Sequence, residues 1–142
     1  MTTLTTAPLG PLLDRLFEEA AATSPTTSPA VADLLEDHEH LMQSKTKYLY
    51  LYERLKDFPL AVSRETGALL YMLARSCNAR TIVEFGTSFG ISTLHLAAAL
   101  RDNGGGKLIT SEFEPSKVAR ARDHHGAAGL QPGAAQLHRV GS

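Results

Sequence analysis

Five residues between positions 84 and 112 have the types and the spacing needed to hold a nucleotide-like ligand. Glu84, Gly86, Gly90 and Ser92 form the pattern E-x-G-x-x-x-G-x-S, and Glu112 follows 22 positions after Gly90. Glycines let a backbone approach a ligand closely, and an acid placed about 20 residues after a glycine loop can accept hydrogen bonds from both hydroxyls of a ribose. The dinucleotide fingerprint G-x-G-x-x-G is not matched, because serine and isoleucine occupy its second and third glycine positions.

A strand, a loop and a helix are the elements that must position these residues. The run TIVEF at 81–85 is rich in β-branched and aromatic residues, which predicts a buried strand that ends at Gly86. After Gly90 the apolar residues recur at helical spacing. The N-terminus of that helix is therefore expected at the carboxyl end of the strand, where open α/β sheets bind ligands. The run KLITSE at 107–112 predicts a second strand with Glu112 at its tip.

Three segments, in this order, resemble the class I S-adenosylmethionine-dependent methyltransferases, in particular the small-molecule O-methyltransferases of the catechol and caffeoyl-CoA type. They are LAVSRETGALLYMLAR at 60–75, VEFGTSFGIS at 83–92 and LITSEFEP at 108–115, within a similar stretch from 58 to 129 that makes up half of the chain. The resemblance implies an α/β, Rossmann-like class I methyltransferase fold. We expect it to be incomplete here, with about three parallel strands, flanking helices and additional N-terminal helices.

The resemblance also implies a binding site for S-adenosylmethionine. The backbone near Val62 and Ser63 would help to hold the methionine part, Ser92 would contact its carboxylate, and Glu84 would meet its amino end. Glu112 would bind the ribose. The full set of expected cofactor-binding residues is Val62, Ser63, Glu84, Gly86, Thr87, Ser88, Gly90, Ser92 and Glu112.

The reaction implied by the resemblance is O-methylation of a small molecule, which would be the partner of the protein. Members of the family often use a divalent metal and a base, but this sequence offers no recognisable ligand set and no base. We therefore name no catalytic residue and no metal ligand. His124 and His125 are adjacent, and His38 and His40 are two apart, so neither pair lies on one helix face with the spacing of a zinc site. These histidines are expected to be solvated or to cap backbone groups.

The end of the chain lies where the resembling family has further strands. AAQLHRV at 134–140 predicts a third strand, and the family's strand with the catalytic and metal-binding acid should follow and lie beside 81–85. The backbone of 81–85 would then be unpaired on one side. Either the chain is a C-terminally shortened methyltransferase, or it is a half-domain that another chain completes. We favour the first, because 81–83 contains no proline or lysine that would protect an edge.

Two other functions remain compatible with the sequence. The half-fold could be a non-catalytic cofactor-binding or assembly module, which would show retained dimerisation without cofactor binding. The glycine loop could also belong to an unrelated nucleotide-binding enzyme, which would bind NAD or ATP tightly but not S-adenosylmethionine. The exposed strand edge and the partly covered helices predict a homo-oligomer in each case.

Composition places the chain among globular proteins. Its 142 residues are 43% hydrophobic and 20% charged, with a net charge of −1, so it has no electrostatic bias toward nucleic acid or a membrane surface. Residues 1–13 contain neither the basic segment nor the apolar run of a signal peptide or membrane span. The default expectation is a cytoplasmic protein.

Three regions are expected along the chain. Residues 1–29 would be a mobile segment and linker, 30–57 a helical region, and 58–142 the N-terminal half of the cofactor-binding domain. A helix is predicted from 30 to 56, interrupted or bent near Ser44, and its aromatic end at 48–55 is core, pocket wall or dimer surface. A further helix is predicted to begin after an N-cap at Ser63, with four residues facing the sheet: Leu69, Leu70, Leu73 and Ala74.

Overall fold

The computed structural model describes residues 2–24, 28–31, 34, 38–44, 46–130 and 135–139. The helices and strands follow in the order η1 (Thr3–Thr5), α1 (Leu9–Ala22), η3 (Pro29–Val31), α3 (His38–Gln43), α4 (Tyr48–Arg54), α5 (Arg64–Ser76), β1 (Thr81–Phe85), α6 (Ile91–Asp102), β2 (Lys107–Glu112), α7 (Pro115–Ala127) and β3 (Ala135–Arg139). None of the helices in these ranges is long and apolar enough to cross a lipid bilayer.

The sheet has the order β1-β2-β3, and both of its strand pairs are parallel. Phe85 lies opposite Ser111, and Glu112 lies opposite Arg139. The predicted α/β fold with three parallel strands is therefore confirmed. Because parallel strands point the same way, β1 and β2 finish at the same edge of the sheet, and the predicted glycine loop begins at that edge.

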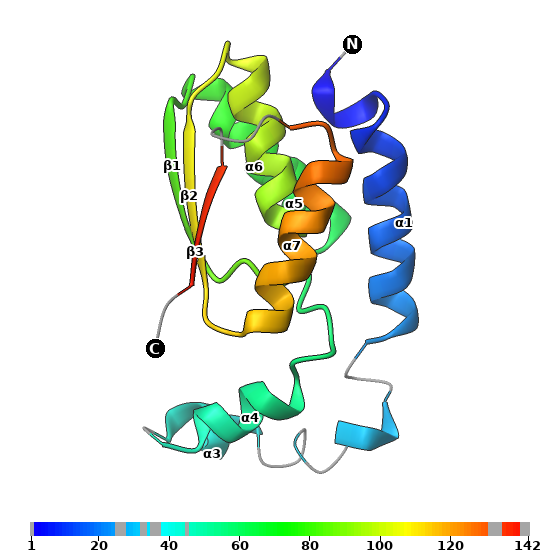
Figure 1. The fold of residues 1–142 in the computed structure, drawn as a ribbon, viewed down its shortest axis with the longest axis vertical. Helices are drawn as coiled ribbons and strands as arrows, with labels where there is room; N and C mark the ends of the chain where they lie inside the picture. The colour runs from blue at the N-terminus through cyan, green and yellow to red at the C-terminus, as the bar shows by residue number, and fades with distance from the viewer. Residues whose placement is uncertain are drawn as a thin grey trace.

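Three layers build the body of the molecule (Figure 1): the sheet, then helices α5, α6 and α7 on one of its faces, then α1 on the outside of these helices. The central helix α6 is buried almost all round, including its alanine run at 97–99. Leu94, Ala98 and Leu108 have no exposed surface and form the middle of the main core. Four leucines of α1 belong to the same core: Leu9, Leu12, Leu13 and Leu16.

Helix α5 begins as the sequence predicts but turns a different face inward. The Ser63 hydroxyl accepts a hydrogen bond from the Thr66 N–H at 3.2 Å, which confirms the N-cap. The prediction that Leu69 and Leu73 face the sheet is wrong, because their side chains are 49% and 55% exposed. Gly67, Tyr71 and Ala74 are the buried residues, since α5 packs mainly on α6.

Gly67 marks the closest approach between α5 and α6. A Cβ atom at this position would lie 2.7 Å from the imidazole ring of His95 on α6. The space is too small for any side chain, so a glycine inside α5 lets the two helices come together. A glycine inside a helix lowers the stability of the helix by about 1 kcal/mol relative to alanine, and the close packing at Gly67 comes with this loss.

The N-terminal region contains helix α1 and the shorter helices α3 and α4. Helix α1 spans Leu9–Ala22, and the segment before it is attached to α6, because Asp102 accepts a hydrogen bond from the Thr3 N–H at 3.0 Å. The Tyr71 hydroxyl of α5 donates to the same carboxylate at 2.6 Å. Among the described residues of the helix predicted over 30–56, the structure has separate helices α3 (His38–Gln43) and α4 (Tyr48–Arg54). The predicted interruption near Ser44 is confirmed: its hydroxyl accepts a hydrogen bond from the Lys47 N–H just before α4.

Candidate functional site

A pocket of ≈ 590 Å³ opens where β1 and β2 end. Three of the predicted site residues, Gly86, Ser88 and Glu112, line this pocket together. They come from the start of the glycine loop, its middle and the tip of β2. The parallel register therefore brings together residues that are about 25 positions apart in the sequence, as predicted from the strand-loop-helix pattern.

Glu112 is held at the base of the pocket by backbone N–H groups. Its Oε2 accepts from the Ser88 N–H at 2.7 Å, and its Oε1 accepts from the N–H groups of Phe113 and Glu114 at 2.9 and 3.1 Å. The side chain is 9% exposed. A carboxylate can accept about four hydrogen bonds, so this one is fixed in orientation and still has acceptor capacity for a ligand hydroxyl.

The glycine loop has three residues at positive φ, a backbone conformation that favours glycine. Gly86 and Gly90 have φ of 89° and 88°, and Ser88 between them has φ of 49°. A Cβ atom at Gly86 would meet nothing within 4 Å, so open space lies next to the backbone at the mouth of the pocket. The N–H groups of Gly86 and Thr87 both donate to the Ser111 carbonyl at 3.0 Å, which ties the loop to β2.

Six of the nine predicted site residues do not line the pocket: Val62, Ser63, Glu84, Thr87, Gly90 and Ser92. Glu84 accepts hydrogen bonds from the hydroxyls of Ser92 and Thr93, each at 2.5 Å, and of Thr110 at 2.7 Å. Thr87 is 2% exposed, and its hydroxyl donates to the Ser111 carbonyl at 3.1 Å. These side chains join β1, β2 and α6 behind the loop, so their observed contacts hold the loop in shape.

The segment before α5 also reaches the loop, through its backbone. The Leu60 N–H donates to the Ser88 hydroxyl at 3.1 Å. Val62 and Ser63 follow directly, and neither side chain lines the pocket. The structure thus brings the first two of the three predicted segments side by side, and it joins the third through Glu112.

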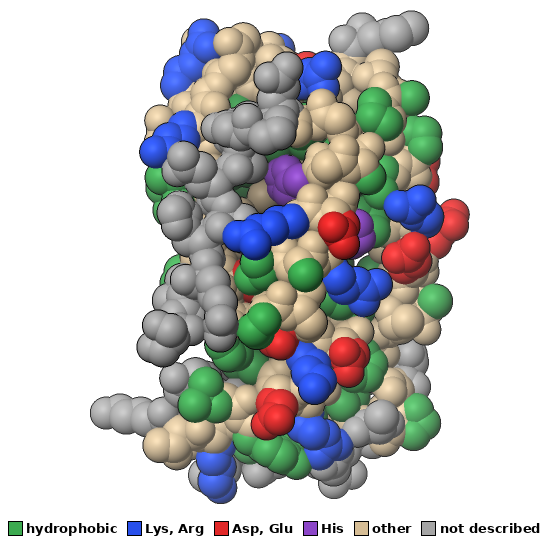
Figure 2. All heavy atoms as spheres, in the orientation of Figure 1, with side chains coloured by type: hydrophobic (Ala, Val, Ile, Leu, Met, Phe, Trp, Pro, Cys, Tyr) green, Lys and Arg blue, Asp and Glu red, His purple; other side chains and the backbone are tan. Residues whose placement is uncertain are grey.

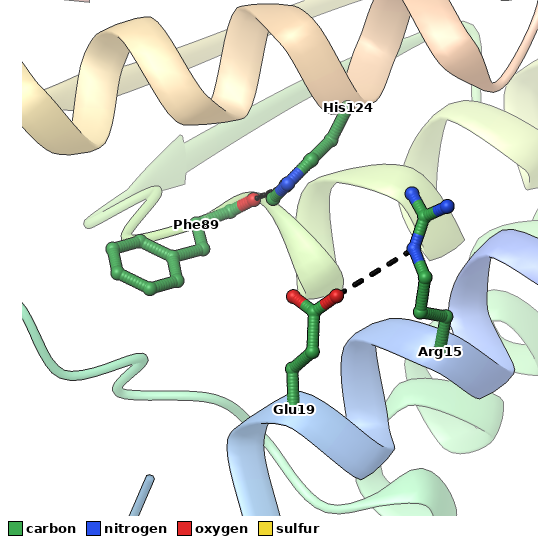
Figure 3. Close-up of polar contacts among 4 residues, drawn as sticks. All are labelled: Arg15, Glu19, Phe89 and His124. Carbon is green, nitrogen blue, oxygen red and sulfur yellow. Dashed lines mark hydrogen bonds and ion pairs between the residues drawn. The ribbon is translucent and has the colours of Figure 1, made fainter.

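Helix α7 holds the other side of the loop (Figure 3). The Nδ1 of His124 donates to the Phe89 carbonyl at 2.7 Å, and the Arg120 guanidinium lies 4.2 Å from the centre of the Phe89 ring. His124 is therefore a capping histidine, as predicted. The ion pair between Arg15 and Glu19, also drawn in Figure 3, lies on α1 with both side chains at least half exposed, so it adds little stability.

Lys117 is a pocket residue that the sequence reasoning missed. It lies in the first turn of α7, lines the pocket with Glu112 and Glu114, and is only 2% exposed. Burial lowers the pKa of its ammonium group, whereas the charges of Glu112, Glu114 and Asp57 oppose that shift. A signal was available, because the first turn after a strand tip places its side chains next to that tip.

Helix α4 supplies the opposite wall of the pocket. Leu49 and Tyr52 line the cavity, and the Tyr52 ring meets the Phe113 ring edge to face at 5.3 Å. Leu51 is buried with Val31, Leu34 and Leu41 in a small second core, whereas Tyr50 is 49% exposed. The segment 48–55 was predicted to be core, pocket wall or dimer surface. Leu51 belongs to a core, whereas Leu49 and Tyr52 line the pocket.

The donor groups present do not fit a bound metal. Within the ranges that the structure describes, no three His, Cys, Asp or Glu side chains come together in a way that could hold a metal ion. Lys, Arg, Asp and Glu side chains are interspersed on the face shown in Figure 2, and neither positive nor negative side chains form a continuous patch there. The described pocket combines a fixed carboxylate, an open glycine backbone and aromatic side chains in its lining.

Comparisons with known proteins identify the family of this chain. Residues 34–134 match the family model described as O-methyltransferase. A Mycolicibacterium vanbaalenii protein named as an O-methyltransferase is 35% identical over 115 residues, which are 80% of this chain and 50% of the relative. A catechol O-methyltransferase of Niastella koreensis is 42% identical over 71 residues, 50% of this chain and 31% of the relative.

A solved structure gives the same result for the fold. The O-methyltransferase TomG from Streptomyces achromogenes, involved in tomaymycin synthesis and crystallised with SAM, is 33% identical, with a TM-score of 0.52 over 75% of this chain and 48% of TomG. This chain spans half or less of the length of these relatives. It belongs to the O-methyltransferase family.

Proposed function

We propose that this chain forms the cofactor-binding part of an S-adenosylmethionine-dependent O-methyltransferase that acts on a small molecule. The observation that carries the proposal is the geometry of Glu112, a buried carboxylate held by three N–H groups at the base of the pocket. The crystal structure of TomG with SAM supports the choice of ligand. Residues 58–142 would make up the N-terminal half of the cofactor-binding domain.

In this proposal, each part of the cofactor is bound by particular residues of the chain. Glu112 accepts from a ribose hydroxyl, and Gly86 lets the backbone approach the ligand, whereas Gly90 faces Ala121 of α7. The methionine end lies toward Ser92 and the backbone of Val62 and Ser63. Glu84 already accepts three hydroxyl hydrogen bonds, so about one acceptor position remains on it for an amino group.

In the proposed mechanism, the residues of this chain mainly bind and orient the cofactor. When bound, the cofactor supplies a sulfonium methyl group that an oxygen nucleophile can attack in line with the departing sulfur. The fixed Glu112 carboxylate and the glycine loop would orient the nucleoside, and the hydroxyl cluster around Glu84 would keep the loop rigid. No metal ligand is assigned, because no three His, Cys, Asp or Glu side chains among the described residues come together in a way that could hold a metal ion.

Calorimetry with S-adenosylhomocysteine tests the proposal directly. Glu112→Ala should weaken binding by about 1–3 kcal/mol, because a ribose hydroxyl loses a charged acceptor. Asp123→Ala is the matched control, since Asp123 is an exposed acid on α7. Equal affinities for the wild type and the Glu112 variant would remove Glu112 from the site.

A non-catalytic assembly module is the second candidate, and the uncovered face of the sheet favours it. Val83 and Phe85 on β1 are 73% and 91% exposed, and a parallel sheet normally has both faces covered. We propose that the chain associates with a further copy. Retained association in sedimentation without any binding of S-adenosylhomocysteine would select this candidate over the first.

A further inference from the structure

The wall that α4 adds to the pocket stands next to the residue expected to bind the ribose. Phe113 follows Glu112 directly, and the Tyr52 ring contacts the Phe113 ring at 5.3 Å and 85°. Figure 1 shows α4 beyond the edge of the sheet where β1 and β2 finish, apart from the helices that cover the sheet. Tyr52 therefore reaches the pocket from a region outside the strand-loop-helix unit.

Helix α4 is otherwise anchored to its own small core. Leu51 is 2% exposed and packs with Val31, Leu34 and Leu41, while Leu55 and Phe58 cover the edge of this group. This second core is separate from the main core around α6. A ligand between Tyr52 and Glu112 would contact both parts of the chain at once.

We propose that Tyr52 binds the purine base of the nucleoside whose ribose Glu112 holds, an inference that rests on the proposed function. The base is bonded to the same sugar that presents its hydroxyls to Glu112, so it must lie within one sugar of that carboxylate. The remaining pocket beside Glu112 is lined by apolar and aromatic side chains, including Leu49, Leu60, Phe85 and Phe113. Purines stack on aromatic rings, and these side chains offer apolar surface that a base can cover.

Tyr50 provides a matched comparison on the same helix. It is two residues away, is 49% exposed, and its hydroxyl accepts a hydrogen bond from Arg54 at 2.7 Å. It does not line the pocket. Replacing Tyr50 removes an aromatic ring from α4 without removing one from the site.

The test is calorimetry on the full chain with two probes, S-adenosylhomocysteine and adenosine. Tyr52→Ala should weaken both by about tenfold, because stacking on the base is common to both ligands. Tyr50→Ala should leave both affinities within about twofold of the wild type. Tyr52→Leu keeps the apolar bulk that packs α4, so it should fold as the wild type does and still show the loss. Hydrogen exchange at 48–54 should slow on binding in the wild type but not in Tyr52→Leu.

The outcomes separate this inference from the proposed function. A folded Tyr52→Leu variant with wild-type affinity overturns the role of Tyr52, while loss of binding in Glu112→Ala would still support the cofactor site. An equal loss in the Tyr50 and Tyr52 variants also overturns it, because α4 would then act only as a whole. If the wild-type chain binds neither probe, both the proposed function and this inference fail.

Discussion

The two faces of the sheet differ in how far their side chains are buried, although the same strands form both faces. On the helix-covered face, the alternate β2 residues Leu108, Thr110 and Glu112 are 0%, 1% and 9% exposed. On the other face, Val83 and Phe85 of β1 are mostly exposed despite being apolar. The residues of β1 suit burial on both faces of the sheet. The described part of the chain covers only one of these faces.

The covered face also contains the polar groups that shape the site. Glu84, Ser92, Thr93 and Thr110 satisfy one another there, because a buried polar group without a partner would cost about 1–3 kcal/mol. The pocket opens where this covered face reaches the end of the strands. The comparison indicates that the buried packing and the polar contacts that shape the loop lie on the covered face.

The largest expected effect tests whether stability depends on the covered face. Leu108→Ala should lower the free energy of unfolding by about 2–5 kcal/mol, because Leu108 is fully buried in the main core. Val83→Ala on the neighbouring strand should cost well under about 1 kcal/mol, since that side chain is mostly exposed. Denaturant unfolding measures both, and similar costs would show that the open face is covered in solution.

A second effect concerns the packing of α5 on α6 within the covered layer. Gly67→Ala should destabilise the protein by about 1–3 kcal/mol, because the new Cβ would lie 2.7 Å from the His95 ring. Gly126→Ala on α7 is the matched control, since a Cβ there meets nothing within 4 Å. It should raise stability by up to about 1 kcal/mol through helix propensity, and thermal unfolding should show the opposite signs. A neutral Gly67 variant would show that the helices can move apart freely.

The third test separates the ligand site from backbone strain. Gly86→Val and Gly105→Val both place a branched residue at positive φ, 89° and 99°, with nothing within 4 Å of the new Cβ. Each should lower stability by about 1–2 kcal/mol. Only Gly86 lines the pocket, so only that variant should lose binding of S-adenosylhomocysteine. Comparable losses of affinity from both would mean that the binding loop has been misplaced.

The smallest effect is a pH dependence that comes from the covered layer. Burial lowers the pKa of His95 from its usual 6.5, so the folded state binds the proton less well than the unfolded state does. The stability that comes from neutral His95 is complete above pH 6.5 and is lost as the pH falls below it. The free energy of unfolding should therefore decrease on acidification, and less so in His95→Gln. An unchanged slope in that variant would place the effect elsewhere, for example at His125, whose pKa burial also lowers.

The local sequence pattern was sufficient to predict the strand, loop, helix and strand over 81–112. The β-branched run at 81–85, the change to helical spacing after Gly90 and the acid at the tip of 107–112 predict a strand, loop, helix and strand, and β1, α6 and β2 follow that order. The Ser63 cap and the meeting of Gly86 with Glu112 were also predictable. These features depend on backbone conformation and on the direction of parallel strands, which short stretches of sequence specify.

Only the tertiary structure decided which side chains face the core, the pocket or the solvent. Leu69 and Leu73 have helical spacing like core residues, but α5 packs on α6 through Gly67 and leaves them exposed. Tyr50, Leu51 and Tyr52 are consecutive, yet one is exposed, one is buried and one lines the pocket. The physical reason is that burial depends on what other segments place opposite a residue, and the sequence around the residue does not contain that information.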